Sequence, residues 1–212
     1  FAESGFEFVR DSTSEITDNR FESSRRLFDR PNLSGSYSKE TTSGSVFNLV
    51  GEINGYYSEV TEESERLAGT PNANTRALKQ SEDEYNFEIG TDYEFVVGAG
   101  RLKLMGLHRF ESSPTVDRTT SSFASGAISG SIFSRQADEA ESILRAEFAF
   151  TALNSQWRWS LEGTENYLDI ESQLDELNVQ GDLSPVNLTG ANSRVEETRA
   201  ESTLNVSKRL GE

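Results

Sequence analysis

The feature that most constrains this chain is an alternation of apolar and polar residues that continues over unusually long runs. Between residues 46 and 58 the odd positions hold mainly Phe47, Leu49, Ile53 and Tyr57, and polar residues stand between them. Residues 85–97 follow the same rule. A period of two places alternate side chains on opposite faces of a β-strand. The sequence therefore predicts an all-β protein whose strands each carry one apolar face.

The connections between these runs come in two sizes. Short ones are expected at 42–45, 98–100 and 154–155, and longer polar ones at 11–19, 69–76, 121–130 and 177–193. Strict alternation of the two sizes is typical of an antiparallel up-and-down meander. About eight long strands fit, at residues 1–10, 21–41, 45–68, 77–97, 100–122, 132–153, 156–176 and 194–209.

Two of the short connections predict a strand register. A two-residue loop at Gly98 and Ala99, with glycine first, indicates a type II′ hairpin. This loop places polar residues opposite one another, in the pairs Glu94–Lys103 and Glu88–Arg109. A loop at Asn154 and Ser155 would place apolar residues opposite one another, in the pairs Phe150–Trp159 and Phe148–Leu161.

Composition excludes several classes of function. The chain of 212 residues has 36 acidic and 20 basic residues, a net charge of −16, which argues against a nucleic-acid binder. It has no Cys and one His, so a thiolate metal site and a cysteine nucleophile are excluded. Neither a helical membrane span nor a signal peptide is visible. Because the chain begins at Phe1 and its one Met is Met105, we expect it to be a piece of a longer protein.

Aromatic residues gather at two levels along the strands. The level near the short turns holds residues expected to face lipid: Tyr93, Phe95, Phe148, Phe150, Trp157 and Trp159. The second level, about ten residues further, holds Tyr57, Tyr85, Phe110 and Tyr167. Tilted strands need about ten residues to cross the ~25 Å apolar band of an outer membrane, which is edged by aromatic girdles. The spacing thus favours a transmembrane β-barrel in the bacterial outer membrane.

Residues at the alternate positions of these strands are polar and would line the lumen of such a barrel. Its candidate residues are Arg101, Lys103, Arg109, Arg145, Arg158, Glu88 and Glu94. The cations could meet an anionic chelate or a plug, or Lys103 and Arg109 could simply neutralise Glu94 and Glu88 across the hairpin. Beyond the second aromatic level, several strands become acidic together. Those carboxylates could hold Mg²⁺ or Ca²⁺ that bridges to lipopolysaccharide, attract cationic ligands, or form a solvated surface.

A soluble antiparallel sandwich or a long solenoid is the alternative fold. A sandwich would have shorter strands, with turn signals about every 8–12 residues, and would not need acidic strand ends at one height.

Three segments resemble the early barrel strands of TonB-dependent outer-membrane receptors. They are Thr91–Ser112, preceded by Arg30–Tyr37 and by the glycine-rich Leu49–Tyr56. The resemblance implies a 22-stranded barrel closed by a plug, which imports metal chelates, cobalamin or carbohydrates with energy delivered through TonB. Residues 1–212 would then be a single barrel segment, roughly one third of the whole. The plug and its TonB-contacting segment are not found in the sequence.

Two other functions compete with transport. A complete eight-stranded barrel, structural or adhesive, fits the length, but the chain lacks a terminal aromatic and its last strand has little apolar surface beyond Leu204 and Val206. An enzyme has the least support, because no nucleophile elbow, phosphate-binding loop or dinucleotide motif occurs, and His108 shares the apolar parity. We expect no catalytic, cofactor or metal site. The expected partners are outer-membrane lipid and lipopolysaccharide and, by the resemblance, a plug, the TonB system and an unidentified small ligand.

Overall fold

The protein is built from β-strands alone. The computed structural model describes residues 1–66, 73–178 and 180–208, and no helix occurs among them. The strands are β1 (Ala2–Arg10), β2 (Ile16–Asp29), β3 (Asn32–Glu40), β4 (Val46–Arg66), β5 (Asn74–Val97), β6 (Gly100–Ser112), β7 (Thr115–Phe123), β8 (Ile128–Ala152), β9 (Ser155–Leu177), β10 (Leu183–Val186) and β11 (Ser193–Ser207).

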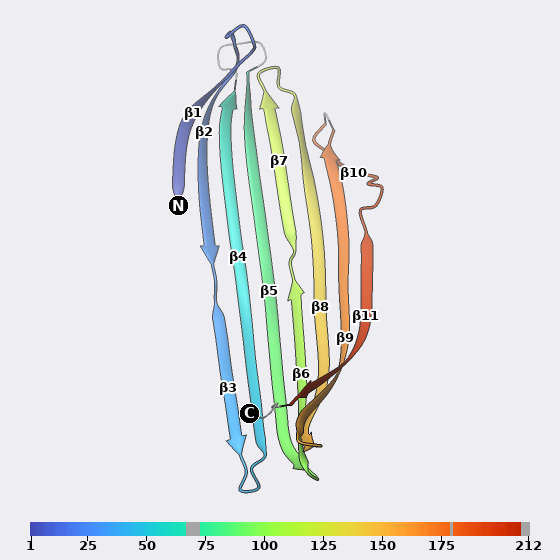
Figure 1. The fold of residues 1–212 in the computed structure, drawn as a ribbon. Helices are drawn as coiled ribbons and strands as arrows, with labels where there is room; N and C mark the ends of the chain where they lie inside the picture. The colour runs from blue at the N-terminus through green and yellow to red at the C-terminus, as the bar shows by residue number, and fades with distance from the viewer. Residues whose placement is uncertain (67–72, 179, 209–212) are drawn as a thin grey trace.

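These strands form one antiparallel sheet that runs in chain order (Figure 1). Eight strand positions follow one another as β1-β2-β4-β5-β6-β8-β9-β10. The other strands share a position with a neighbour in sequence: β3 follows β2 along β4, β7 follows β6 between β5 and β8, and β11 follows β10 along β9. The predicted all-β, up-and-down meander of eight long strands is confirmed.

Prolines explain two of the interruptions within a strand position. Pro31 separates β2 from β3, and Pro114 separates β6 from β7. Proline has no backbone N–H and therefore breaks the ladder on one side. Its carbonyl still accepts a hydrogen bond, from Gly55 N at 2.9 Å for Pro31 and from Asp83 N at 3.1 Å for Pro114. Each strand consequently resumes in the same register.

Four hairpins share one turn geometry. The backbone N–H of the first loop residue donates to the carbonyl four residues later, at 2.9 Å in each case, and the fourth residue has a positive φ. This is a type I turn followed by a G1 bulge. The positive-φ residues are Ser14 (69°), Gly44 (77°), Gly126 (84°) and Gly181 (86°).

The two-residue hairpins test the predicted registers. Gly98 has φ +58°, as a type II′ turn requires, and the predicted pairs Glu94–Lys103 and Glu88–Arg109 are confirmed. The second loop is at Leu153 and Asn154, with φ of 58° and 57°, and not at Asn154 and Ser155. Positive φ at both central residues is the type I′ geometry.

The register predicted for this second hairpin is therefore wrong by two residues. Phe148 lies opposite Trp159, and Phe150 lies opposite Trp157. Because a shift of two residues preserves parity, the aromatic side chains keep the predicted face.

Three of the four longer connections are also shorter than predicted. β2 begins at Ile16, β7 and β8 leave only residues 124–127 between them, and 177–193 contains β10. Of the predicted loop at 69–76, residues 69–72 lie outside the described residues and 74–76 belong to β5. The ends of the predicted strands 45–68 and 194–209 also lie outside the described residues. In the sequence, these polar strand ends resemble loops because neither of their faces is apolar.

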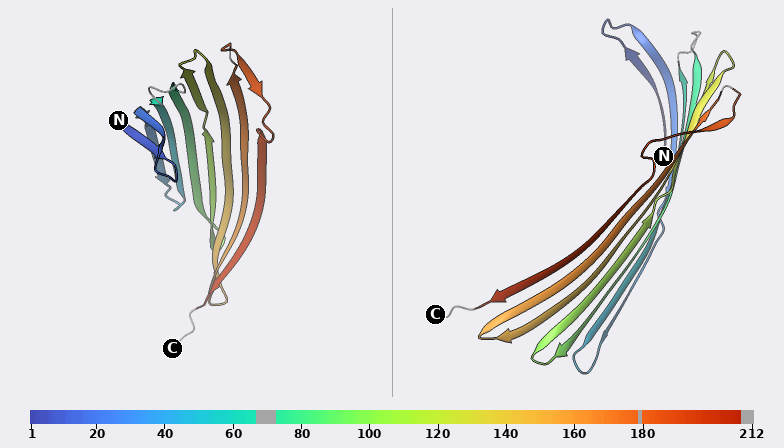
Figure 2. Two further views of the ribbon diagram at one scale, coloured as in Figure 1. Left: turned by 90° about the horizontal axis from the view of Figure 1, so that it is seen from above. Right: turned by 90° about the vertical axis from the view of Figure 1, so that its right-hand side faces the viewer.

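The sheet is a single curved and twisted layer, with no element packed on either face (Figure 2). Among the described residues the buried apolar side chains are Ala137 and Ala140, each 9% exposed. A sandwich or solenoid core is therefore not present in this part of the chain. The outermost strands remain open, because in the described structure β1 pairs with β2 and β11 with β9, and neither pairs with the other.

Candidate functional site: the two faces of the sheet

One face of the sheet, termed the apolar face, gathers the aromatic residues of the first level. Residues that lie directly opposite one another on successive strands form rows across the sheet. One row contains Phe95, Leu102, Phe148, Trp159 and Leu204, and the next contains Val97, Gly100, Phe150, Trp157 and Val206. Tyr93 lies one row further. All six aromatic residues singled out in the sequence are thus on the same face.

Rings on this face contact one another. The ring centroids of Phe148 and Phe150 are 5.3 Å apart, and those of Phe150 and Trp157 are 6.2 Å apart. Both indole N–H groups have acceptors: Trp157 donates to the Ala152 carbonyl at 3.1 Å and Trp159 to Ser202 Oγ at 3.0 Å.

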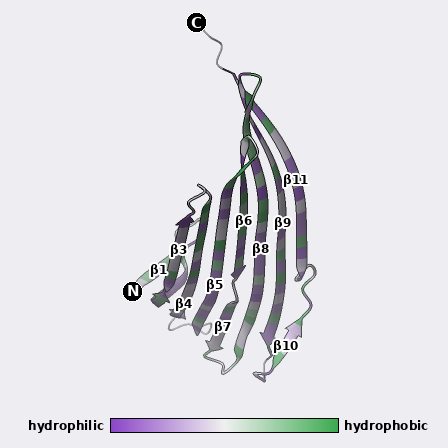
Figure 3. Ribbon diagram, turned by 90° about the horizontal axis from the view of Figure 1, so that it is seen from below, coloured by the Kyte–Doolittle hydropathy of each residue, from purple (hydrophilic) through white to green (hydrophobic). Residues whose placement is uncertain are grey.

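Large apolar side chains on this face are uncovered. Leu144 is 72% exposed, Leu204 58% and Ile53 58%. Hydrophobic residues alternate along the strands in Figure 3. Contiguous exposed apolar surface on this scale marks contact with a partner or a membrane.

The apolar face ends at the second aromatic level. Tyr85 and Phe110 lie on it with ring centroids 5.9 Å apart, and Tyr57 and Tyr167 share the face. Carboxylates begin beyond this level with Glu59 on β4, Asp83 on β5, Asp138 on β8 and Asp169 on β9, although on β9 Glu165 already lies two residues nearer the turn than Tyr167.

This boundary is oblique to the rows. Asp169 lies in the row of Asp138, Ser112 and Tyr85, whereas Glu59 lies in the row of Ser81, four residues further from the Gly98 turn along β5. The apolar surface therefore shifts toward the short turns from β4 to β9. Tilted strands produce this pattern when a planar apolar layer crosses them.

The other face, termed the polar face, carries the residues predicted to line a lumen: Glu88, Glu94, Arg101, Lys103, Arg109, Arg145 and Arg158. The cations form a network of ion pairs. Arg101 pairs with Glu94, Lys103 Nζ lies 3.4 Å from Asp92 Oδ1, and Arg109 contacts Glu111 at 3.2 Å and Glu139 at 3.5 Å.

Lys103 and Arg109 do not form the direct cross-hairpin ion pairs considered for them. Lys103 selects Asp92 instead of Glu94, and Arg109 selects Glu111 and Glu139 instead of Glu88. Long side chains on a twisted sheet reach diagonal partners, such as Asp92 and Glu139, and a neighbour on the same strand, such as Glu111, so backbone register does not determine ion pairing.

Ion pairs continue toward the open edge at β11. Arg145 contacts Glu147 at 3.4 Å and Glu162 at 3.8 Å, and Arg158 contacts Glu147 at 3.3 Å. Arg199 on β11 contacts Glu162 at 3.7 Å. The side chains of these three arginines are 41–61% exposed, so their guanidinium groups are accessible from the polar side.

A ladder of amides on the polar face was missed in the sequence. Asn32 on β3 donates to Glu52 at 2.8 Å and to Asn54, and Asn54 donates to Asn86 on β5 at 3.0 Å. The available signal was the equal spacing of Asn32 and Asn54, each nine residues from an end of the turn at 41–45.

A hollow of about 310 Å³ opens on the polar face between β6, β8, β9 and β11. Arg109, Glu139, Glu141, Asn166 and Glu197 contribute its polar lining. On β5, next to the second aromatic level, the pKa of Glu84 is raised above its usual value. Partial burial is the main cause, and the neighbouring Glu111 carboxylate is the second.

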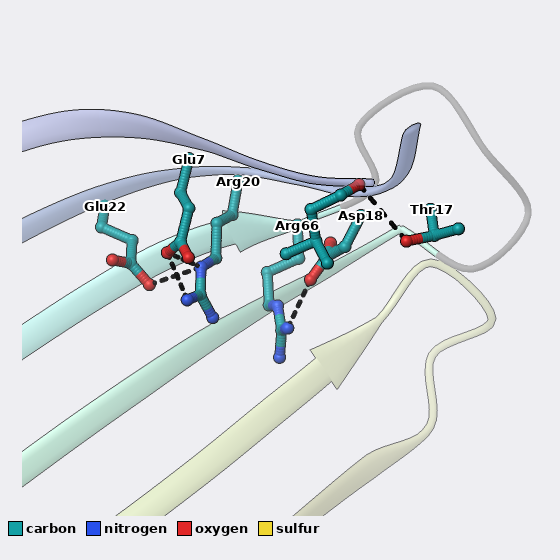
Figure 4. Close-up of polar contacts among 7 residues, drawn as sticks. Glu7, Thr17, Asp18, Arg20, Glu22 and Arg66 are labelled. Atoms are coloured by element: carbon teal, nitrogen blue, oxygen red, sulfur yellow. Dashed lines mark hydrogen bonds and ion pairs between the residues drawn. The ribbon is translucent and has the colours of Figure 1, made fainter. Parts of the chain in front are cut away.

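Another polar cluster lies toward the connections at residues 11–15, on β1, β2 and β4 (Figure 4). Arg20 contacts Glu7 and, at 3.0 Å, Glu22, while Arg66 contacts Asp18 at 2.6 Å. The hydrogen bond to Glu7 raises the pKa of Arg20. The two arginines lie directly opposite each other, and their separate carboxylates offset the repulsion between them.

His108 lies on the apolar face and contacts a serine. Its Nδ1 is 2.9 Å from Ser142 Oγ, and its ring centroid is 5.6 Å from that of Phe87. Ser142 pairs with β6 on one side and β9 on the other, so the backbone N–H groups around it serve the ladder. Acyl transfer needs donors aimed at a developing oxyanion, and this arrangement does not provide them.

In the described residues, no group of three or more His, Asp or Glu side chains is arranged to hold a metal ion. No helix in the described ranges is long and apolar enough to cross a membrane. Neither a protein-family model nor a curated protein matches the sequence.

Proposed function

We propose that this chain is part of the wall of a TonB-dependent receptor in the bacterial outer membrane, which imports a small ligand such as a metal chelate or a carbohydrate. The observation that carries the proposal is the uncovered apolar face. A single layer cannot bury one of its own faces, so an apolar environment outside the described sheet must cover it.

Lipid fits this face better than a second protein layer does. The apolar surface has an aromatic level at each end and an oblique boundary, as expected where tilted strands cross a bilayer. On β5 it extends from Tyr85 to Val97, 12 residues apart and close to the length that a tilted strand needs to span the membrane.

The polar face then borders the lumen. Accessible arginines at Arg101, Arg145 and Arg158, together with the amide ladder, offer donors for an anionic chelate, a sugar or a plug. The resemblance of Thr91–Ser112 to receptor strands is the reason for choosing this class of barrel.

A complete eight-stranded barrel is the second candidate, and the eight strand positions favour it. Closure would require β1 to pair with β11, whereas both keep an open edge. An open edge is not tolerated in hydrocarbon, so further strands would complete the larger barrel.

Tryptophan fluorescence tests the lipid contact. Both tryptophans of the chain, Trp157 and Trp159, lie on the apolar face. We expect brominated acyl chains to quench them strongly in reconstituted protein. As a control, Arg158→Trp in a Trp157→Phe, Trp159→Phe background places the one indole on the polar face and should be quenched less. Equal quenching of the two proteins would contradict the assignment of the faces.

Uptake tests the transport class. Cells that express the intact protein should accumulate one of three labelled probes, a ferric chelate, cobalamin or an oligosaccharide, and lose that accumulation when TonB is deleted. Accumulation that persists without TonB would favour passive passage through a small barrel.

A further inference from the structure

Three cations form a row on the apolar face beyond the second aromatic level. Arg25 on β2 lies opposite Thr61, Thr61 lies opposite Lys79 on β5, and Lys79 lies opposite Arg118 on β7. Directly paired residues in a sheet project from the same face. The three side chains therefore share the outward side with Tyr85 and Tyr93.

Two of these cations lack an acidic partner within the described residues. Arg25 and Arg118 are exposed and form no ion pair there. Lys79 Nζ lies 2.8 Å from Glu59 Oε2 and stays 55% exposed. By contrast, eight of the fifteen arginines in the described ranges form ion pairs, namely Arg20, Arg66, Arg101, Arg109, Arg145, Arg158, Arg194 and Arg199. Free cations in a chain of charge −16 favour an anionic ligand.

The distance of the row from the second aromatic level indicates which part of a membrane ligand it can contact. Lys79 is six residues from Tyr85 along β5, which is about 20 Å along the strand and about 15 Å along the membrane normal at a tilt of ~40°. Asp29, Asp83 and Asp138 lie on the same face between the aromatic level and the row. These carboxylates disfavour phosphate close to the acyl chains. The cations can accept it further out, where the sugars of a glycolipid lie.

Apolar side chains flank the row. Leu27 and Val116 lie one row nearer the membrane on the same face, 47% and 38% exposed. They can contact the apolar faces of sugar rings while the cations meet charged groups.

We propose that Arg25, Lys79 and Arg118 bind phosphate groups on the sugar core of a glycolipid in the outer leaflet. This inference rests on the proposed function, because it requires the apolar face to lie in the membrane. Two guanidinium groups and one ammonium, spread over four adjacent strands, suit a multiply phosphorylated ligand that lies across the barrel wall.

Binding of lipopolysaccharide to the intact, detergent-extracted protein tests the proposal. Three probes are compared: lipopolysaccharide with a phosphorylated core, the same molecule after removal of the core phosphates, and lipid A alone. We expect the phosphorylated core to bind at least about tenfold more tightly than either other probe, and Arg25→Gln, Lys79→Gln, Arg118→Gln to remove that preference.

A matched control changes charge equally on the other face. Arg26, Arg76 and Arg135 lie on the polar face in the same half of the sheet, so Arg26→Gln, Arg76→Gln, Arg135→Gln should retain the preference. Where the triple variant does not fold, Arg118→Gln alone should weaken binding of the phosphorylated core by about threefold.

Equal affinity for the three probes, or equal losses in the two triple variants, would overturn the phosphate site. Tryptophan quenching by brominated lipid on the same samples separates the failures. If brominated lipid quenches the tryptophans but the phosphorylated core is not preferred, only this site is refuted. If the tryptophans are not quenched, membrane insertion is refuted.

Discussion

Ser14 adopts a backbone conformation that is unfavourable for a residue other than glycine. It occupies the positive-φ position of a G1-bulge hairpin, with φ of 69°, where the other three hairpins of this type have glycine. An L-residue in this region crowds its Cβ against the backbone. The turn forms nevertheless, because Asp11 Oδ1 accepts hydrogen bonds from Thr13 N at 2.8 Å and Glu15 N at 3.0 Å.

Ser14→Gly should stabilise the protein by about 1 kcal/mol, because relief of the steric cost exceeds the added freedom of glycine in the unfolded chain. Urea unfolding in lipid vesicles measures the change. The reciprocal substitution, Gly44→Ser, occupies the equivalent position of another hairpin and should destabilise by a similar amount. A loss of stability in Ser14→Gly would refute the argument from strain.

Glu84 predicts a dependence of stability on pH. Burial, then Glu111, raises the pKa of Glu84 from 4.5 in the folded state. A carboxyl with a raised pKa favours folding below its unfolded pKa, and that contribution disappears as pH rises through the folded pKa. Glu84→Gln should therefore gain stability relative to the wild type as pH increases from about 4 to 7. Unfolding curves across this range measure the difference. A difference in the free energy of unfolding between the two proteins that does not change with pH would show that Glu84 has no raised pKa.

At the scale of strands and turns, the sequence pattern predicted which face of the sheet each side chain occupies. It did not predict the exact turn positions or the ion-pair partners, which depend on local geometry. The alternation of apolar and polar residues correctly predicted the face on which Trp157 lies, and the glycine at Gly98 correctly predicted the turn there. The loop at Leu153 and Asn154 was missed because leucine is a poor candidate for positive φ. Ion-pair partners such as Asp92 for Lys103 were missed because long side chains reach diagonally.

The β8–β9 turn can be improved by design. Leu153 is 85% exposed and has φ of 58° in a type I′ turn that prefers Asn followed by Gly. Leu153→Asn with Asn154→Gly should raise the free energy of unfolding by about 1 kcal/mol without changing the strand register. Thermal unfolding in detergent gives the first quantity. A cross-strand disulfide between Cys substituted at Phe148 and Trp159 reports the register, and its absence under oxidation would contradict the observed pairing.

At the scale of the whole sheet, the overall composition and the placement of the residues give different impressions. A charge of −16 suggests an ordinary acidic soluble protein, yet the apolar residues lie on one face and the ion pairs on the other. Alternation predicted this separation. Under the proposed function, the transported ligand could not be predicted, because it would depend on contacts across a lumen and not on the periodicity of one sheet.

The membrane assignment predicts a large asymmetry between two neighbouring positions. Leu161 lies on the apolar face opposite Ser202, whereas Thr203, the next residue on β11, lies on the polar face. Leu161→Arg should cost about 2–4 kcal/mol if the side chain meets the middle of the bilayer, because a guanidinium must then enter hydrocarbon. Phe148→Arg on the same face lies at the first aromatic level, near the edge of the apolar band, and should cost less than Leu161→Arg. Thr203→Arg keeps its charge in water and should change stability by less than about 0.5 kcal/mol. Reversible unfolding in phospholipid vesicles measures all three variants. Comparable costs at Leu161 and Thr203 would mean that water contacts both faces, and the barrel proposal would then fail.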